Sequence, residues 1–241
     1  LWVDYDLMSN IPGLFVAGEA NFSDHGANRL GASALMQGLA DGYFVIPHSV
    51  GNYLAENRHD LHDIDGTEEA FDDAESNVKD QINRLLKVSK SNAEKSPEER
   101  RTPMDIYKEL GHIMWDNVGI ARSEESLTEA QNKIESLRDE FWNKLYIPTD
   151  TDTFNKNLEV AGRVADFLEL GELMAKDALH RDESCGCHLR EEHTTDEGEA
   201  LRNDEDYSYV AAWEFEDVGE HTLNKEDLEF ENVELKQRSY K

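Results

Sequence analysis

The chain has 241 residues, of which 53 are Asp or Glu and 24 are Lys or Arg, so its formal net charge is -29 at pH 7. This acidity argues against nucleic acid or an anionic lipid surface as the main partner, because both carry negative charge themselves. Hydrophobic residues make up 38% of the chain, which is enough to bury a core and argues against wholesale disorder.

The start of the chain and its uneven charge indicate how it is organised. Leu1 lies inside a short apolar run and is not a methionine, so we expect a piece of a longer protein. No apolar run reaches the roughly 18 residues that a membrane-spanning helix needs, and no signal peptide is predicted. Residues 1–50 carry five acids and one base, which makes them the least charged segment and predicts a buried, site-forming part.

This first segment predicts a strand, a loop and a helix in that order. Gly13–Glu19 is a short apolar run, typical of a strand buried on both faces of a largely parallel sheet. Ala32–Gly42 carries Leu35, Met36 and Leu39 at helical spacing and predicts a helix. A strand, a loop and a helix arranged in this way bind ligands at the carboxyl end of the strand.

The middle of the chain predicts helices with clear start signals. Residues 69–88 end in a short apolar stripe after a charged stretch. A second helix is predicted from Thr102-Pro103, which supply an N-cap and a proline at the first helical position, with Asp105 completing a capping pattern. Gly119 is placed to end this helix.

Two further helices and a β-rich tail follow. One helix is predicted over 127–141 from a cap at Ser126, and the next over 158–179, so three amphipathic helices in succession predict an antiparallel bundle. The tail is predicted as a charged loop followed by two strands, Tyr207–Phe215 and Leu228–Leu235, the second of which alternates nearly strictly.

The loop after the first predicted strand contains an isolated cation. Arg29 is the only Lys or Arg among residues 1–50, and it lies between Gly26 and Gly31, where the backbone can approach a ligand closely. A guanidinium in such a loop is suited to binding a carboxylate through two parallel hydrogen bonds. The alternative is a structural role, in which Arg29 pairs with Asp24 or with the carboxyl end of a helix.

Glu19 and the start of the following helix offer a second candidate interaction. At the end of the predicted strand, the Glu19 carboxylate could accept hydrogen bonds from hydroxyl groups of a nucleotide or flavin chain, or it could simply cap a turn. The helix beginning near Ala32 would direct its first N–H groups into the same loop, which favours electron-rich groups there.

These residues carry a resemblance to a known family. Ile11–Glu19 followed by His25–Gly31 resembles the signature of the flavoprotein subunit of succinate dehydrogenase and fumarate reductase. The Leu30–Leu35 variant and the long tail resemble the branch of that family found in Bacteroidetes-like bacteria. Further along, the resemblance takes in the helical bundle, the Arg181–Ser184 turn with Gly186 and His188, the strand with Trp213, and the closing Phe230–Val233.

The resemblance implies a fold class and a division of the chain. We expect an α/β FAD-binding domain remnant of the strand-loop-helix kind, an α-helical three-helix bundle and a small C-terminal β-hairpin region. Residues 1–50 would be the C-terminal end of the FAD-binding domain and 51–100 a charged helical connector. Residues 101–181 would be the helical bundle domain, and 182–241 an acidic C-terminal tail with two strands.

The resemblance also implies roles for individual residues. Arg29 would bind a carboxylate of succinate or fumarate, and Glu19 would contact FAD. The backbone at Ala34 and Leu35 would meet the flavin ring. Many relatives have Gly-Asn-Ser-Leu where this chain has Ala32–Leu35, so only a backbone contact is implied at Ala34.

The activity implied is oxidation of succinate to fumarate with FAD as cofactor. Electrons would pass through an iron-sulfur subunit to a membrane quinone, and a membrane-anchor cytochrome b subunit would be an indirect partner. The location implied is cytoplasmic, peripheral on the inner face of the cell membrane. The family's glycine-rich dinucleotide fold and its proton-transfer arginine would lie upstream of Leu1, so the catalytic residues are unknown and the piece alone is predicted to be inactive.

Three alternatives stay open. Fumarate reductase runs the same chemistry in reverse at one site. L-aspartate oxidase has a His-Gly-Ala-Asn-Arg type of loop, but it usually continues with Met and Ala-Ser-Asn-Ser, unlike Leu30-Gly31-Ala32 in this chain. The third alternative is a non-catalytic docking and scaffolding module.

One further cluster invites a metal interpretation. Cys185 and Cys187 precede His188, with His180 and His193 nearby. Paired cysteines of zinc sites are usually separated by two to four residues, and a second pair is missing. The sequence therefore predicts structural thiols and no metal site.

Overall fold

The computed structural model describes residues 1–21, 33–59, 68–148, 154–229, 231–232 and 234–236. It divides into two compact units, Leu1–Asp72 (unit 1) and Asp73–Lys241 (unit 2). The described part is mostly helical, with small sheets of two strands each. None of its helices is both long enough and apolar enough to cross a membrane.

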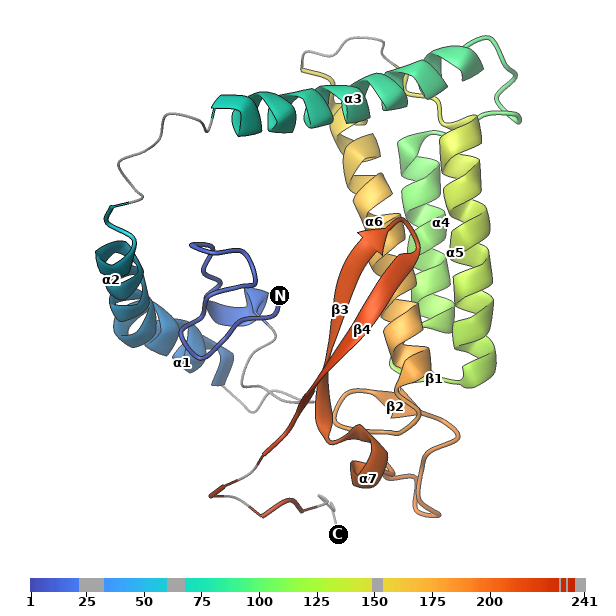
Figure 1. The fold of residues 1–241 in the computed structure, drawn as a ribbon. Helices are drawn as coiled ribbons and strands as arrows, with labels where there is room; N and C mark the ends of the chain where they lie inside the picture. The colour runs from blue at the N-terminus through green and yellow to red at the C-terminus, as the bar shows by residue number, and fades with distance from the viewer. Residues whose placement is uncertain (22–32, 60–67, 149–153, 230, 233, 237–241) are drawn as a thin grey trace. The chain divides into compact units, whose positions relative to one another are not determined.

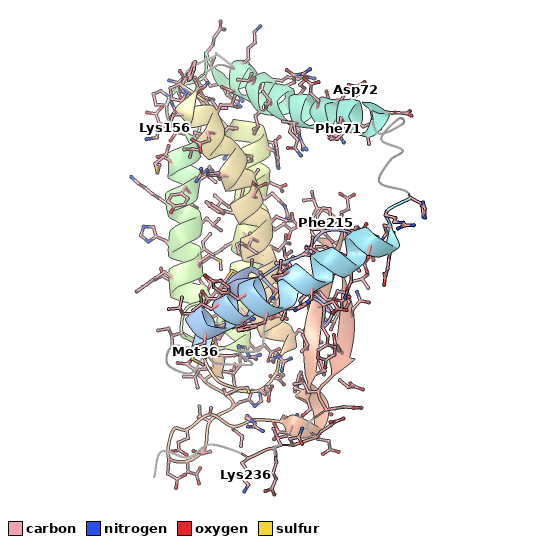
Figure 2. The ribbon with its side chains drawn as sticks, turned by 90° about the vertical axis from the view of Figure 1, so that its left-hand side faces the viewer. Met36, Phe71, Asp72, Lys156, Phe215 and Lys236 are labelled. Atoms are coloured by element: carbon pink, nitrogen blue, oxygen red, sulfur yellow. The ribbon has the colours of Figure 1, made fainter. Side chains whose placement is uncertain are left out.

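Unit 1 is built on a long helical segment that follows a short turn. The turn is a 3-10 helix, η1 (Gly18–Ala20), and the helical segment comprises α1 (Ser33–Ala40), η2 (Asp41–Val45) and α2 (Ile46–Glu56). Figure 2 shows these three as one unbroken rod, because η2 is a π-helical turn that does not interrupt the helical backbone. The helix predicted from Ala32 is confirmed from Ser33 onward, and it continues beyond Gly42.

The strand predicted over Gly13–Glu19 is wrong. Phe15 forms only an isolated antiparallel bridge with Met8, and the Val16 N–H donates to the Leu7 carbonyl at 2.9 Å. The run thus folds back on the residues just before it, and no neighbouring strand is present in the described part of unit 1 to extend a ladder. Gly13 (φ +83) and Gly18 (φ +71) also leave the extended conformation at the two ends of the run.

Unit 2 has one apolar core, formed mainly by three long helices. These are α4 (Pro103–Asn117), α5 (Glu124–Lys144) and α6 (Lys156–His180), and each packs against the other two. Their inward faces repeat at helical spacing, as the sequence predicts. The fully buried apolar side chains of the core include Ile106, Leu127, Ala130, Ile134, Phe141, Ala161, Val164 and Leu168.

A fourth helix, α3 (Glu68–Asn92), crosses one end of these three helices (Figure 1). Figure 2 shows Lys156, the first residue of α6, at the same end. Two buried polar side chains connect α3 to the segment after α5. The Asn92 amide donates to the carbonyls of Asn143 and Leu145 at 3.1 Å each, and Ser89 exchanges hydrogen bonds with the Ile147 backbone. These contacts satisfy backbone groups that the end of α5 leaves unpaired.

The helix start signals in the sequence are confirmed at α4 and corrected at α5. Thr102 caps α4, and Asp105 completes the capping box. The N-cap of α5 is Ser123, whereas the sequence predicted Ser126. Ser126 is the third residue of the helix, and its hydroxyl oxygen accepts from the Ser123 N–H at 3.0 Å. The earlier serine caps because this reciprocal pair satisfies two backbone donors at once.

The second predicted tail strand is displaced. The tail contains an antiparallel hairpin of β3 (Tyr209–Asp217) and β4 (Glu220–Asp227), so the strand predicted over Leu228–Leu235 is wrong in position. The chain reverses earlier, at Gly219, which has φ +76. A residue other than glycine rarely adopts that backbone conformation, which makes Gly219 the turn signal.

The hairpin lies along α6 (Figure 1). The Trp213 indole N–H donates to Asp177 at 2.7 Å, and the buried His221 ring contacts Glu169 at 3.1 Å. At the far end of α6, β1 (Ala121–Arg122) pairs in parallel with β2 (Leu189–Arg190). The short helix α7 (Asp204–Tyr207) leads from there into the hairpin.

Candidate functional site

Three of the four residues predicted to form the site lie in the described part of unit 1. Glu19 is in η1 and is exposed. Ala34 and Leu35 are in the first turn of α1, where the Ala34 side chain is buried and the Leu35 side chain is 71% exposed. Arg29, predicted to bind the substrate carboxylate, lies outside the described residues.

Two backbone N–H groups fix the turn that carries Glu19 through hydrogen bonds. Gly18 adopts a left-handed backbone (φ +71), and its N–H donates to the Asp41 carboxylate at 2.8 Å. The Asn21 N–H closes the turn on the Gly18 carbonyl at 3.2 Å. Glycine adopts this left-handed conformation readily, whereas other residues rarely do. The conformation of Gly18 therefore sets the direction in which the chain continues into Glu19.

A second polar contact supports the far side of the turn. Asn21 is buried, and its amide donates to the Val16 carbonyl at 3.1 Å. The Gln37 amide, on α1, donates to the Asn21 side-chain oxygen at 3.4 Å. Sequence reasoning missed Asn21, Gln37 and Asp41. The available signal was Asp41 itself, an acid embedded in an otherwise apolar helical stretch.

The start of α1 supplies the second element of the site. Backbone N–H groups in the first turn of a helix have no partner within the helix and lie at the positive end of its dipole. Ala34 is buried, and its methyl group can neither donate nor accept a hydrogen bond, so any polar contact with a ligand there would be made by the backbone. The chemistry offered is therefore N–H donors from α1 and a carboxylate acceptor from Glu19.

This set of groups fits FAD. The hydroxyl groups of the cofactor need acceptors, which the exposed Glu19 carboxylate provides. Its electron-rich ring and phosphates are favoured near helix N-terminal N–H groups. The two elements belong to one packed unit, because η1 packs against α1 and the Gly18 Cα lies close to Gly38, the sixth residue of that helix.

The cysteine motif of unit 2 has a different character. Cys185 and His188 pair in a tight turn through two backbone hydrogen bonds, with Gly186 at φ +61. Burial raises the pKa of the Cys185 thiol and lowers the pKa of His188, and the His188 Nε2 atom is engaged by the Arg181 carbonyl at 2.7 Å. Within the described ranges, no three His, Cys, Asp or Glu side chains are grouped so as to hold a metal ion.

Charged residues on either side of this turn are buried in ion pairs. Glu183 binds Arg181 at 2.9 Å and accepts from the Asn203 N–H at 2.8 Å. Arg190 is 2% exposed, donates to the Ala178 and Leu179 carbonyls at the end of α6, and contacts the Asp182 carboxylate at 3.3 Å. The carbonyl end of a helix favours a cation, so these residues attach the tail to α6.

Comparison with known proteins gives matches over most of the chain. A family model described as fumarate reductase flavoprotein C-term matches residues 107–240. The succinate dehydrogenase flavoprotein subunit of Bacillus subtilis (strain 168) is 31% identical over 208 residues, covering 86% of this chain and 32% of the relative. The fumarate reductase flavoprotein subunit of Haemophilus influenzae is 28% identical over 193 residues, covering 80% of this chain and 29% of the relative.

A solved structure shows the same fold. Quinol-fumarate reductase with menaquinol molecules matches with a TM-score of 0.74 at 24% sequence identity, covering 95% of this chain and 36% of that chain. The chain thus spans about a third of the length of the curated relatives that it matches.

Proposed function

This chain belongs to the succinate dehydrogenase and fumarate reductase flavoprotein family, and we propose that it supplies one wall of the site at which succinate is oxidised to fumarate with FAD. The observation that carries the proposal is the packing of the Gly18–Glu19 turn against α1. This packing places the turn with the acceptor carboxylate against the helix whose N-terminal N–H groups would face the cofactor.

In this proposal, three residues bind and orient the cofactor. Glu19 accepts hydrogen bonds from FAD hydroxyl groups, and the backbone at Ala34 and Leu35 contacts the flavin ring. FAD, when bound, supplies the two-electron acceptor for the hydride equivalent that leaves succinate. The protein contributes position and electrostatics, and an exposed carboxylate on a fixed turn is suited to both.

Arg29 binds one carboxylate of the dicarboxylate substrate. It is the only Lys or Arg among residues 1–50 and has a glycine on either side within three residues. A planar guanidinium holds a carboxylate through two hydrogen bonds and so fixes the orientation of the substrate as well as its position.

We also propose partners and a location, on the model of the family. An iron-sulfur subunit would receive the electrons, and a membrane-anchor cytochrome b subunit would pass them to quinone. This would hold the flavoprotein at the inner face of the cell membrane. The matching structure named quinol-fumarate reductase supports a quinone-linked assembly.

The reverse reaction, reduction of fumarate, is the second candidate. It is favoured by the relative named fumarate reductase, whose identity to this chain is close to that of the succinate dehydrogenase. One site serves both directions, since the same dicarboxylate and flavin atoms react.

The proposed division of the chain has four parts. Residues 1–50 form the carboxyl-terminal end of an FAD-binding domain, and 51–100 form a charged helical connector. Residues 101–181 form a three-helix bundle domain, and 182–241 form an acidic tail. Support comes from the mutual packing of α4, α5 and α6 around a shared core.

The function is tested on the purified holoenzyme under anaerobic conditions. Added succinate should remove the absorbance band of oxidised flavin, and fumarate should restore it. L-aspartate should have no effect, which separates the proposal from an L-aspartate oxidase. Loss of the band with L-aspartate but not with succinate would overturn the proposed substrate.

The role of Glu19 is tested by Glu19→Ala in the same holoenzyme. The variant should retain less FAD after purification, because the hydroxyl groups lose a charged acceptor. Glu56→Ala, another exposed acid of unit 1 at the end of α2, is the control and should retain FAD as the wild type does. Equal flavin absorbance in all three proteins would remove Glu19 from the site.

A further inference from the structure

One face of the α1–η2 helix is devoted to the turn that carries Glu19. Ala34, Gln37, Gly38 and Asp41 are spaced three, four and seven residues apart, so they lie on the same side of the helix. Gln37 binds Asn21, Asp41 binds Gly18, and the Gly38 Cα lies against the Gly18 Cα. Ala34 is buried on the same side, whereas Met36, labelled on the same helix in Figure 2, is exposed.

Asp41 makes the shorter of the two side-chain hydrogen bonds on this face. Its side chain is buried, with 5% of the residue exposed, and its carboxylate accepts from the Gly18 N–H at 2.8 Å. The contact joins residues 23 positions apart, so it is a tertiary bond and not part of a local turn. A buried carboxylate is costly unless hydrogen-bonded, and a hydrogen bond to a charged acceptor is stronger than a neutral one.

This hydrogen bond is made by Gly18, the residue directly before Glu19, and so it affects the direction of Glu19. Gly18 is left-handed, and the peptide N–H that Asp41 accepts belongs to that same residue. The next residue is Glu19, whose side chain is exposed and whose backbone direction is set by the Gly18 torsion angles. An acceptor that holds the Gly18 N–H therefore holds the direction of Glu19 without touching it.

We propose that Asp41 is a positioning residue for FAD, which holds the Gly18 N–H and thereby presents the Glu19 carboxylate to the hydroxyl groups of the cofactor. This inference rests on the proposed function, because it takes Glu19 as the residue that contacts FAD. Asp41 is the first residue of the π-helical segment η2, so η2 helps to support the turn that carries Glu19.

A purely structural role for Asp41 predicts a different pattern of effects. If Asp41 only stabilised unit 1, its removal would lower the melting temperature, and FAD affinity would follow the fraction of folded protein. If Asp41 positions Glu19, a folded variant without the acceptor binds FAD weakly, and a variant that restores an oxygen acceptor recovers binding. Asn supplies such an oxygen with nearly the same shape.

The test measures FAD binding to the apo form of the native flavoprotein, produced in a riboflavin-auxotrophic host and titrated with FAD. Asp41→Ala should raise the Kd for FAD about tenfold, since a charge-assisted hydrogen bond is lost. Asp41→Asn should stay within about threefold of wild type, because the Gly18 N–H keeps an acceptor. Circular dichroism checks that each variant is folded.

Ser49→Ala is the matched control. Ser49 is a buried polar residue of α2 whose hydroxyl donates to the Val45 carbonyl at 3.2 Å. The Ser49→Ala variant loses a hydrogen bond of the same helical segment but leaves the turn that carries Glu19 intact. Its Kd for FAD should therefore equal that of wild type.

The outcomes separate this inference from the proposed function. If wild-type protein does not bind FAD, the proposed function fails. If wild type binds FAD and folded Asp41→Ala binds it equally well, the positioning role alone is overturned. An Asp41→Asn variant weakened tenfold or more overturns it as well, and this result can overturn it even if Asp41→Ala does not fold.

Discussion

Each of the two units of this protein is stabilised internally in a different way. Unit 2 has a continuous apolar core between α4, α5 and α6. In the described part of unit 1, the buried apolar side chains are Val3, Val16 and Ala34, and polar contacts such as that between Gly18 and Asp41 fix the turn. Substitutions in unit 2 should therefore change the free energy of unfolding, and those at the turn of unit 1 should change ligand binding.

The largest loss of unfolding free energy is expected from a cavity in the core of unit 2, and this tests the comparison most severely. Phe141 is 0% exposed and packs edge-on against Trp142, with ring centroids 4.9 Å apart. Phe141→Ala should lower the free energy of unfolding by about 4 kcal/mol, because it loses apolar burial and leaves a cavity. Urea unfolding followed by tryptophan fluorescence measures this.

Phe215→Ala is the control for Phe141→Ala. Phe215 lies on the hairpin and is 60% exposed, so its loss should cost less than about 1 kcal/mol. A Phe141→Ala cost as small as that of the control would contradict a core centred on α5.

A smaller loss is expected from the buried cation that attaches the tail to α6. Arg190→Ala should lower the free energy of unfolding by about 3 kcal/mol, because the helix-end carbonyls and the neighbouring acids lose their partner. Arg163→Ala is the control, since that side chain is 66% exposed and pairs with Glu159 on the surface. Its cost should stay within about 0.5 kcal/mol, and similar costs for the two arginines would show that Arg190 adds nothing by being buried.

The smallest expected effect is on the free energy of unfolding at low pH. Burial lowers the pKa of His188 below its ordinary value of 6.5 in the folded protein; the contact with the Arg181 carbonyl opposes this shift, and the nearby Arg122 and Arg190 add to it. The unfolded chain therefore binds a proton at a higher pH than the folded one. The stability contributed by neutral His188 is complete above about pH 6.5 and is lost as the pH falls through the folded pKa.

His188→Gln should accordingly make the decline in unfolding free energy between about pH 7 and 5 less steep. His112→Gln, on the exposed surface of α4, should leave the decline as it is in wild type. The measurement is a series of urea titrations at several pH values. Identical slopes for wild type and His188→Gln would rule out a contribution of the buried imidazole.

The long helices were predictable because their signals are local. Residues three and four apart repeat the apolar face of α4, and Thr102 and Asp105 mark its start within four positions. The position of β4 was not predictable in the same way. Leu228–Leu235 alternates more strictly, but the hairpin is set by the reversal at Gly219 and by the contact of His221 with Glu169, 52 positions apart.

The proposed site shows the same contrast between local sequence signals and contacts of distant residues. Glu19, Ala34 and Leu35 could be named from a motif, whereas Asp41 could not, because its partner Gly18 is 23 positions away. An acid in a helix is usually a solvated surface residue, and only the folded chain shows that this one is buried beneath a turn. The strand predicted over Gly13–Glu19 was wrong for the complementary reason, since an apolar run becomes a strand only where a partner strand exists.

Arg29→Lys in the holoenzyme tests the account most directly. Lysine keeps the positive charge but cannot hold a carboxylate with the two parallel hydrogen bonds of a guanidinium. We expect kcat/KM for succinate to fall by about a hundredfold or more, with the flavin-to-protein ratio close to that of wild type. An unchanged kcat/KM would show that the substrate carboxylate is bound elsewhere and would contradict the account.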